Sequence, residues 1–203
     1  MGNVNVSNLK TAVQKLGQTS KFDHPGLVHI TEQDFDVLID LKYAQTDNFT
    51  GQIIYQHDQC FLHPDAAKAL QKAVEVAGTL GFKLKVFDAF RPPSAQERLW
   101  QVCPNPDYVA DPKIGSNHTR GVAVDLTLIN PENGFELDMG TAFDTMESRS
   151  HHFYLGLPQE QMQINRMYLL TVMLTAGFVH HPREWWHYQL PNANSYVLVN
   201  AEI

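Results

Sequence analysis

Residues 121–129, GVAVDLTLI, constrain the fold of this chain more than any other stretch. The run is apolar and rich in β-branched residues, so it predicts a strand in the centre of a sheet, and the NPENG that follows predicts the turn that ends it. Residues 82–90, FKLKVFDAF, alternate as a strand does until the sequence RPP stops them, and residues 184–190, EWWHYQL, predict a last strand. The chain therefore contains a sheet.

Three helices are expected around these strands. Residues 63–81 have a proline in the first turn, apolar residues at helical spacing and a final glycine. Residues 158–176 form a second long helix that Gly177 terminates, and residues 94–102 a short one with Ser94 as its N-cap. Strands and helices alternate without a regular βαβ rhythm. We therefore expect a single compact α+β domain with a mostly antiparallel central sheet and helices packed on it.

Length and composition limit the organisation of the chain. A chain of 203 residues with 43% hydrophobic residues can bury one core, so residues 26–203 are expected to form the domain. Residues 1–25 have fewer apolar residues and are expected to form a peripheral arm or helix. Two cysteines are too few for a disulfide framework or a cysteine-based zinc site.

Charge and hydropathy exclude several classes of partner. The net charge of −7 and the lack of a Lys/Arg cluster argue against nucleic acid and anionic membrane surfaces. No apolar run approaches the roughly 18 residues that span a bilayer. The first residues, MGNVNVSNLK, lack the features of a signal peptide, which favours a cytoplasmic protein, although a periplasmic one remains open if a leader was removed.

A metal site is suggested by residues 116–125, SNHTRGVAVD, in which His118 precedes Asp125 by seven positions. A catalytic zinc ion typically has three protein ligands and one position left for water. The later segment REWWHY offers His187 as the third ligand. Taken alone, these spacings also fit chance pairing and ordinary surface residues.

Glu184 lies three residues before His187 and could act as a base beside the metal. Such a glutamate takes a proton from the attacking water and returns it to the leaving amine, as in the HExxH motif with its parts reordered. Residues three apart on a regular strand point to opposite faces, so both side chains can face one metal only if the chain bends or loops at Glu184–Trp185. Pro182 makes an irregular backbone there plausible.

Read in order, several segments resemble one known family. They are LKYAQTDNFTG at 41–51, DAFRP at 88–92, SNHTRGVAVDLTL at 116–128, LDMGTAFD at 137–144, ESRSHH at 147–152 and EWWHY at 184–188. Together they resemble the zinc D-alanyl-D-alanine dipeptidase family, the VanX-type group, which is related in fold to zinc DD-carboxypeptidases and the hedgehog signalling domain. The resemblance covers about residues 35–190, and the first 30 residues lie outside it.

The resemblance implies a bacterial metallopeptidase that hydrolyses D-Ala-D-Ala, a peptidoglycan building block, with one Zn²⁺ per chain. It implies zinc ligands at His118, Asp125 and His187, a catalytic base at Glu184 and an oxyanion-stabilising cation at Arg91. It further implies substrate-binding roles for three residues. Ser116 would donate to the substrate carboxylate, and Tyr43 and Asp144 would receive the free amino group.

The same residues are compatible with two further functions. The metal triad would also serve a zinc DD-carboxypeptidase or endopeptidase acting on longer peptidoglycan stems. A non-catalytic zinc module is the second alternative, although it would need neither Glu184 nor Arg91. Arg91 could also be a surface salt-bridge residue, Tyr43 a core tyrosine and Asp144 a helix cap. The oligomeric state is not predicted.

Overall fold

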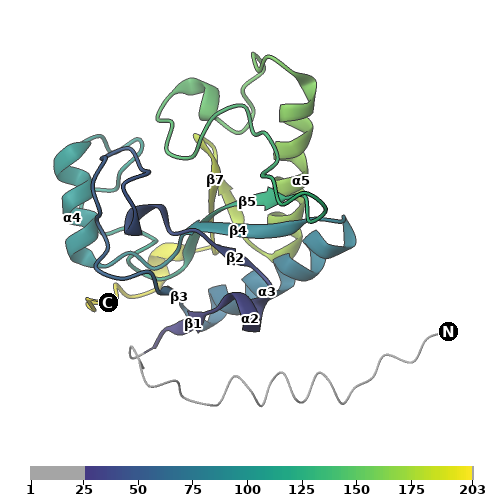
Figure 1. Ribbon diagram of the computed structural model, residues 1–203. Coiled ribbons are helices and arrows are strands. Elements are labelled where there is room, and N and C mark those ends of the chain that lie inside the picture. The colour runs from purple at the N-terminus through teal and green to yellow at the C-terminus, as the bar shows by residue number, and fades with distance from the viewer. Residues whose placement is uncertain (1–25, 203) are drawn as a thin grey trace, which may run out of the picture.

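The computed structural model describes residues 26–202 (Figure 1). Its central sheet has five strands. Their order across the sheet is β2 (Leu38–Ile39), β4 (Lys83–Asp88), β5 (Ala123–Ile129), β7 (Glu184–Gln189) and β6 (Val179–His181). All neighbouring pairs are antiparallel except β2 with β4. The apolar run predicted to be central is β5, the middle strand, and all seven of its residues are buried.

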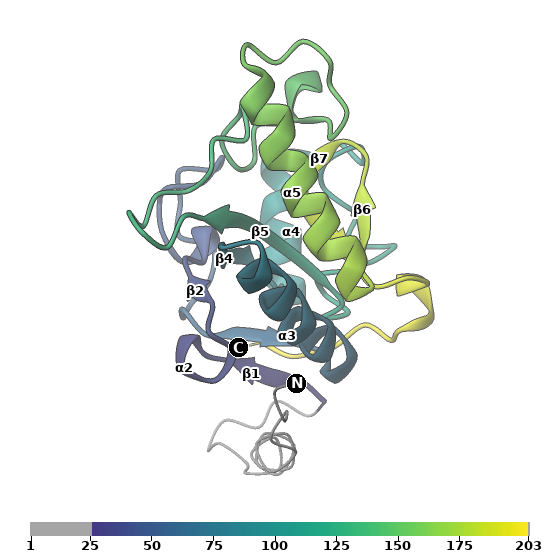
Figure 2. The ribbon, with the colours of Figure 1, turned by 90° about the vertical axis from the view of Figure 1, so that its right-hand side faces the viewer.

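The long helices cover one face of this sheet. Figure 2 shows α3 (Pro64–Thr79) and α5 (Glu160–Ala176) side by side in front of the strands, with α4 (Pro93–Val102) behind them. Smaller elements complete the fold. β1 (Val28–Ile30) pairs with β3 (Cys60–Leu62) in a separate two-stranded sheet. The remaining short elements are α2 (Glu32–Phe35) and the 3-10 turns Lys42–Ala44, Ser148–Ser150 and Ala193–Ser195. The predicted α+β fold with a mostly antiparallel sheet and packed helices is confirmed.

The three predicted helices are present, with ends that differ from the prediction by up to two residues: α3 ends at Thr79 before Gly81, α5 begins at Glu160 after Pro158, and α4 begins at Pro93. Gly177 terminates α5 in the left-handed conformation, with φ of 105°, where a side chain would be strained. Ser94 is not the N-cap of α4, because the helix begins at Pro93 and Pro92 occupies the cap position. Proline suits the first helical turn since it has no N–H to leave unpaired. The Ser94 backbone N–H and hydroxyl instead bond the Glu202 carboxylate.

The remaining structural predictions concern the chain ends, the membrane and the cysteines. Residues 1–25, expected to form an arm or helix, lie outside the described residues. Among residues 26–202, no helix combines the length and the hydropathy that crossing a bilayer requires. Cys60 and Cys103 are both free thiols.

Candidate active site

Three strands of the sheet place acidic and histidine side chains in one row. The register between β4 and β5 shifts between Val86 and Asp88, and this bulge sets Asp88 opposite Asp125. Asp125 in turn pairs with His187 of β7. Because directly paired residues of neighbouring strands project from the same face of a sheet, Asp88, Asp125 and His187 lie next to one another.

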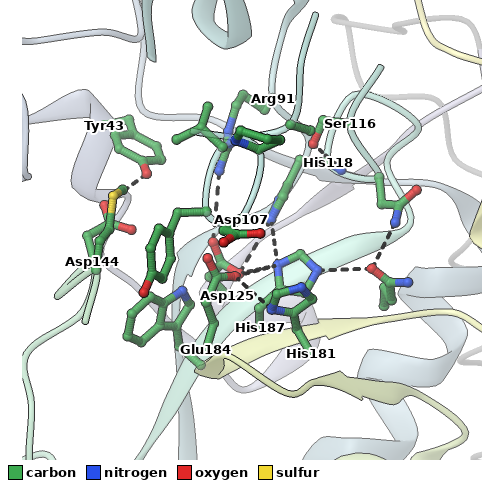
Figure 3. Close-up of a pocket in the computed structure, with 18 residues that line it drawn as sticks. Tyr43, Arg91, Asp107, Ser116, His118, Asp125, Asp144, His181, Glu184 and His187 are labelled. Atoms are coloured by element: carbon green, nitrogen blue, oxygen red, sulfur yellow. Dashed lines mark hydrogen bonds and ion pairs between the residues drawn. The ribbon is translucent and has the colours of Figure 1, made fainter. Parts of the chain in front are cut away.

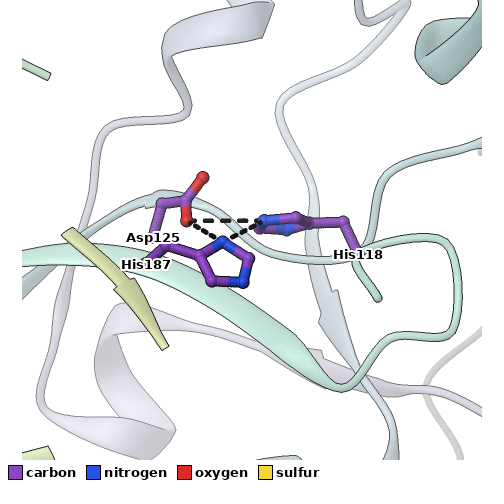
Figure 4. Close-up of side chains that lie close together, drawn as sticks. All are labelled: His118, Asp125 and His187. Carbon is purple, nitrogen blue, oxygen red and sulfur yellow. Dashed lines mark hydrogen bonds and ion pairs between the residues drawn. The ribbon is translucent and has the colours of Figure 1, made fainter. Parts of the chain in front are cut away.

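His118 joins this row from the segment that precedes β5. Its Nε2 lies 3.1 Å from His187 Nδ1 and 3.4 Å from Asp125 Oδ1, and Asp125 Oδ1 lies 3.0 Å from His187 Nδ1 (Figure 4). The three ligand atoms are therefore all within 4.8 Å of one another, and the three residues are at most 9% exposed. The structure thus brings together the three residues that the sequence suggested as metal ligands.

The protonation of both imidazoles is set by acceptors on their far sides. His118 Nδ1 donates to the Ala89 carbonyl at 2.8 Å. His187 Nε2 donates to Gln189 Oε1 at 3.1 Å, and Gln189 Oε1 also accepts from Asn117 at 2.8 Å. The opposite nitrogens, His118 Nε2 and His187 Nδ1, therefore present bare lone pairs to each other and to the Asp125 carboxylate.

A zinc ion fits this arrangement of donors. Two lone pairs and a carboxylate oxygen at 3.0–3.4 Å repel one another unless a cation lies between them. Ligand atoms around a tetrahedral zinc ion with bonds of about 2.0–2.1 Å are about 3.3 Å apart. Two histidines and one carboxylate are also a ligand set typical of catalytic zinc.

The pKa shifts of Asp125 and His118 also indicate that this cluster attracts a positive charge. Burial raises the pKa of Asp125, but the adjacent His118 and His187 outweigh it and hold that pKa well below its usual value. Burial lowers the pKa of His118, yet the charges of Asp125 and Asp88 and the hydrogen bond to Asp125 together outweigh this effect, and the net shift is upward. A proton held between these groups would compete with the metal, as is usual for metal sites.

Glu184 lies beside the three donors but not among them. Its Oε2 is 3.9 Å from His187 Nδ1 and 3.6 Å from His181 Nδ1. Glu184 and His187 can both face the cluster only if the strand is irregular between them, and the irregularity is a shift in strand pairing, where a loop was expected. β7 begins at Glu184, and the pairing with β6 jumps from His180–Tyr188 to His181–Glu184. Burial, followed by the charges of Asp125 and Asp144, raises the pKa of Glu184 well above its usual value.

Arg91 is buried and held by a carboxylate that the sequence patterns did not indicate. Its Nε and one terminal nitrogen donate to Asp88 Oδ2 at 3.0 and 2.7 Å, and the other donates to Gln96 Oε1 at 2.9 Å. The Tyr55 hydroxyl donates to the second Asp88 oxygen. With 7% exposure, Arg91 is not a surface salt-bridge residue, and its guanidinium lies 5.1 Å from the Tyr43 ring centroid.

The three candidate substrate-binding residues lie in the same pocket (Figure 3). The Tyr43 hydroxyl donates to Asp144 Oδ2 at 2.8 Å. Asp144 is not a helix cap: it lies in a loop with φ of 58°, and burial followed by the charge of Asp125 raises its pKa to about 8. Ser116 lies close to His118 instead, and its Oγ accepts from the backbone N–H of His118 at 3.2 Å.

The pocket has a volume of about 140 Å³ and contains all eight candidate residues. It also contains residues that the sequence patterns did not indicate, namely Asn117, His181 and Gln189, while Asp88 lies directly behind Arg91. A carboxylate at the last position of an apolar strand could have indicated Asp88. Nothing in the sequence pattern distinguishes Gln189 from an ordinary polar strand residue.

Comparison with known proteins assigns the chain to a family. A sequence model described as D-ala-D-ala dipeptidase matches residues 23–202. The D-alanyl-D-alanine dipeptidase of Escherichia coli K12 is 49% identical over 164 residues, which are 81% of this chain and 84% of that protein. The D-alanyl-D-alanine dipeptidase of Enterococcus faecium is 34% identical, over 84% of this chain and 96% of its own length. That of Enterococcus faecalis V583 is also 34% identical, over 81% of this chain and 91% of its own length. The chain therefore belongs to the D-ala-D-ala dipeptidase family of metallopeptidases, as its sequence resemblance predicted.

Proposed function

We propose that this protein is a zinc dipeptidase that hydrolyses D-Ala-D-Ala to two D-alanines in bacterial cell-wall metabolism. The observation that carries the proposal is the convergence of three metal-donor atoms, a carboxyl beside them and a buried guanidinium in one small pocket. His118, Asp125 and His187 would hold one zinc ion per chain. When bound, the ion would supply a Lewis acid that polarises the scissile carbonyl.

Glu184 would move the proton in this reaction. Its carboxylate is close to the donor cluster without being one of its three members, so it can accept a proton from the attacking water and return it to the leaving amine. Arg91 would offset the negative charge that develops on the carbonyl oxygen. Asp88 and Gln96 hold three of its donor nitrogens, so the guanidinium is fixed before the substrate binds.

The two charged ends of the dipeptide would bind at opposite parts of the pocket. Asp144 would receive the substrate ammonium, because the Tyr43 hydroxyl occupies only one of its carboxylate oxygens. The Ser116 oxygen accepts a backbone N–H, so its own hydroxyl proton is available for the substrate carboxylate. A pocket of about 140 Å³ with a charged residue at the amino end favours a free dipeptide over a longer peptide stem.

The test compares D-Ala-D-Ala, N-acetyl-D-Ala-D-Ala and a tripeptide ending in D-Ala-D-Ala, each with and without a chelator. Acetylation removes the ammonium and leaves Asp144 without its partner. Since a charge-assisted bond contributes about 1.5–3 kcal/mol, kcat/KM should fall by about 10- to 100-fold or more. Asp144→Ala should reduce the difference in kcat/KM between the free and the acetylated dipeptide, because it lowers kcat/KM more for the free dipeptide.

Comparable kcat/KM values for the free and acetylated substrates would contradict the dipeptidase proposal and favour the carboxypeptidase alternative. If protein that carries zinc hydrolyses none of the three peptides in a chelator-sensitive way, the result would favour the alternative of a non-catalytic zinc module.

A further inference from the structure

His181 is a pocket residue to which the proposed reaction gives no role. It is the last residue of β6, and its Nδ1 is buried without a hydrogen-bond partner within the described residues 26–202. This nitrogen faces Glu184 Oε2 at 3.6 Å (Figure 3). The His181 ring packs edge-on against the His187 ring, with centroids 5.6 Å apart, so its position beside the donor cluster is fixed by packing.

The separation between His181 and Glu184 suits a shared metal ion better than a direct bond. At 3.6 Å the nitrogen and oxygen are too far apart for a hydrogen bond. Two ligand atoms of one zinc ion, with bonds of about 2.0–2.2 Å and an angle between tetrahedral and trigonal, are about 3.3–3.8 Å apart. Imidazole nitrogen and carboxylate oxygen are both ordinary zinc ligands.

We propose that His181 and Glu184 form a second, weaker divalent-cation site, and that zinc bound there inhibits the enzyme. This site is distinct from the donor cluster, because neither of its two ligands belongs to the set of His118, Asp125 and His187. Two protein ligands and water hold an ion less tightly than three protein ligands. The second ion therefore binds only when zinc exceeds one equivalent per chain.

The inhibition rests on the proposed function in one respect, the role of Glu184 as the base. A carboxylate oxygen whose lone pair is donated to a cation cannot accept the proton of the attacking water. A positioned acid–base group is worth about 10²- to 10⁴-fold in rate, so saturation of the second site should lower turnover by about 10²-fold or more. The binding of the second ion does not depend on that role.

The experiment titrates metal-free protein with Zn²⁺ by equilibrium dialysis and follows D-Ala-D-Ala turnover in parallel. The wild type should bind a first ion tightly and a second at higher free zinc, and turnover should rise with the first and fall with the second. His181→Ala and His181→Gln should each bind one ion fewer than the wild type and keep the turnover they reach at one equivalent. Glu184→Gln should also bind one ion fewer.

His180→Ala is the matched control. His180 is the neighbouring histidine of β6, but its ring packs against His152 and Phe153, with centroids 5.3 and 5.4 Å apart. The variant removes one histidine from the same strand and should keep both the second ion and the inhibition. Loss of the second ion in this variant as well would mean that the effect is not specific to His181, and the proposal would be wrong.

Two further results would overturn the proposal. One is a second ion that the wild type and both His181 variants bind equally well. The other is a wild type that binds only one ion while His181→Ala lowers turnover, since His181 would then only orient Glu184. If the wild type shows no turnover at one equivalent of zinc, the proposed function fails, and the dialysis still decides whether the second site exists.

Discussion

Arg166 of α5 is predicted to hold the loop that carries Asp144. Its side chain is fully buried, and its Nε donates to the Met139 carbonyl at 2.7 Å. The two terminal nitrogens donate to the carbonyls of His151 at 2.7 Å and Arg149 at 2.9 Å. One guanidinium therefore ties both ends of the segment 139–151 to the helix, with Asp144 between them.

Replacement of Arg166 by Met keeps an unbranched side chain in place of the aliphatic stem and removes the guanidinium with all three bonds. Each bond to a charged donor contributes about 1.5–3 kcal/mol, so the gross loss is about 5–9 kcal/mol. Part of it is recovered, because an apolar side chain does not carry the cost of burying a charge, the same cost by which burial lowers the pKa of Arg166 to about 10. We expect a net loss of about 3–5 kcal/mol in the free energy of unfolding.

Urea unfolding and thermal melting measure this loss. At about 2–4 °C per kcal/mol for a chain of this size, the melting temperature should fall by about 6–20 °C. The KM for D-Ala-D-Ala should rise because the loop that presents Asp144 is loosened. Zinc content should stay at one per chain, since none of the three donor residues lies in that loop.

Arg149→Ala is the control, because its side chain is 53% exposed and pairs only with Glu147 among the described residues, while its backbone carbonyl stays in place. It should change the free energy of unfolding by no more than about 0.5 kcal/mol. A loss below about 1 kcal/mol for Arg166→Met, within the spread of ordinary substitutions, would refute the reasoning.

Three further predictions concern the pocket. Gln189→Leu removes the acceptor that orients His187 and should weaken zinc binding by about 10- to 100-fold in competition with a chromophoric chelator; unchanged affinity would show that this bond is dispensable. Glu184→Gln should retain the first zinc by metal analysis while turnover falls by about 10²- to 10⁴-fold, and loss of that first zinc would make Glu184 one of its ligands. Asp88→Asn weakens the partner of Arg91 and should lower kcat/KM by about 10-fold or more with zinc retained; wild-type kinetics would mean that Arg91 needs no such support.

The local sequence was sufficient to predict the long helices of this fold. The apolar periodicity of residues 63–81 and 158–176 and the stop at Gly177 predicted α3 and α5, because such signals act within a few residues of the chain. The start of α4 was placed wrongly, since Ser94 competed with Pro92 and Pro93 for the same turn. The parallel pairing of β2 with β4 involves strands far apart in sequence, which no local pattern specifies.

In the candidate site, too, some features could be predicted from the sequence and others depend on the tertiary structure. The sequence suggested His118, Asp125 and His187 as metal ligands, because metal binding demands particular side chains. The zinc peptidase followed only from the resemblance of the ordered segments to a known family. Which nitrogens of His118 and His187 face the three-residue cluster depends on Ala89 and Gln189, and the support of Arg91 depends on a bulge in β4. These features are matters of strand register and of contacts between distant parts of the chain. They arise only when the sheet is assembled, so the tertiary structure decided them.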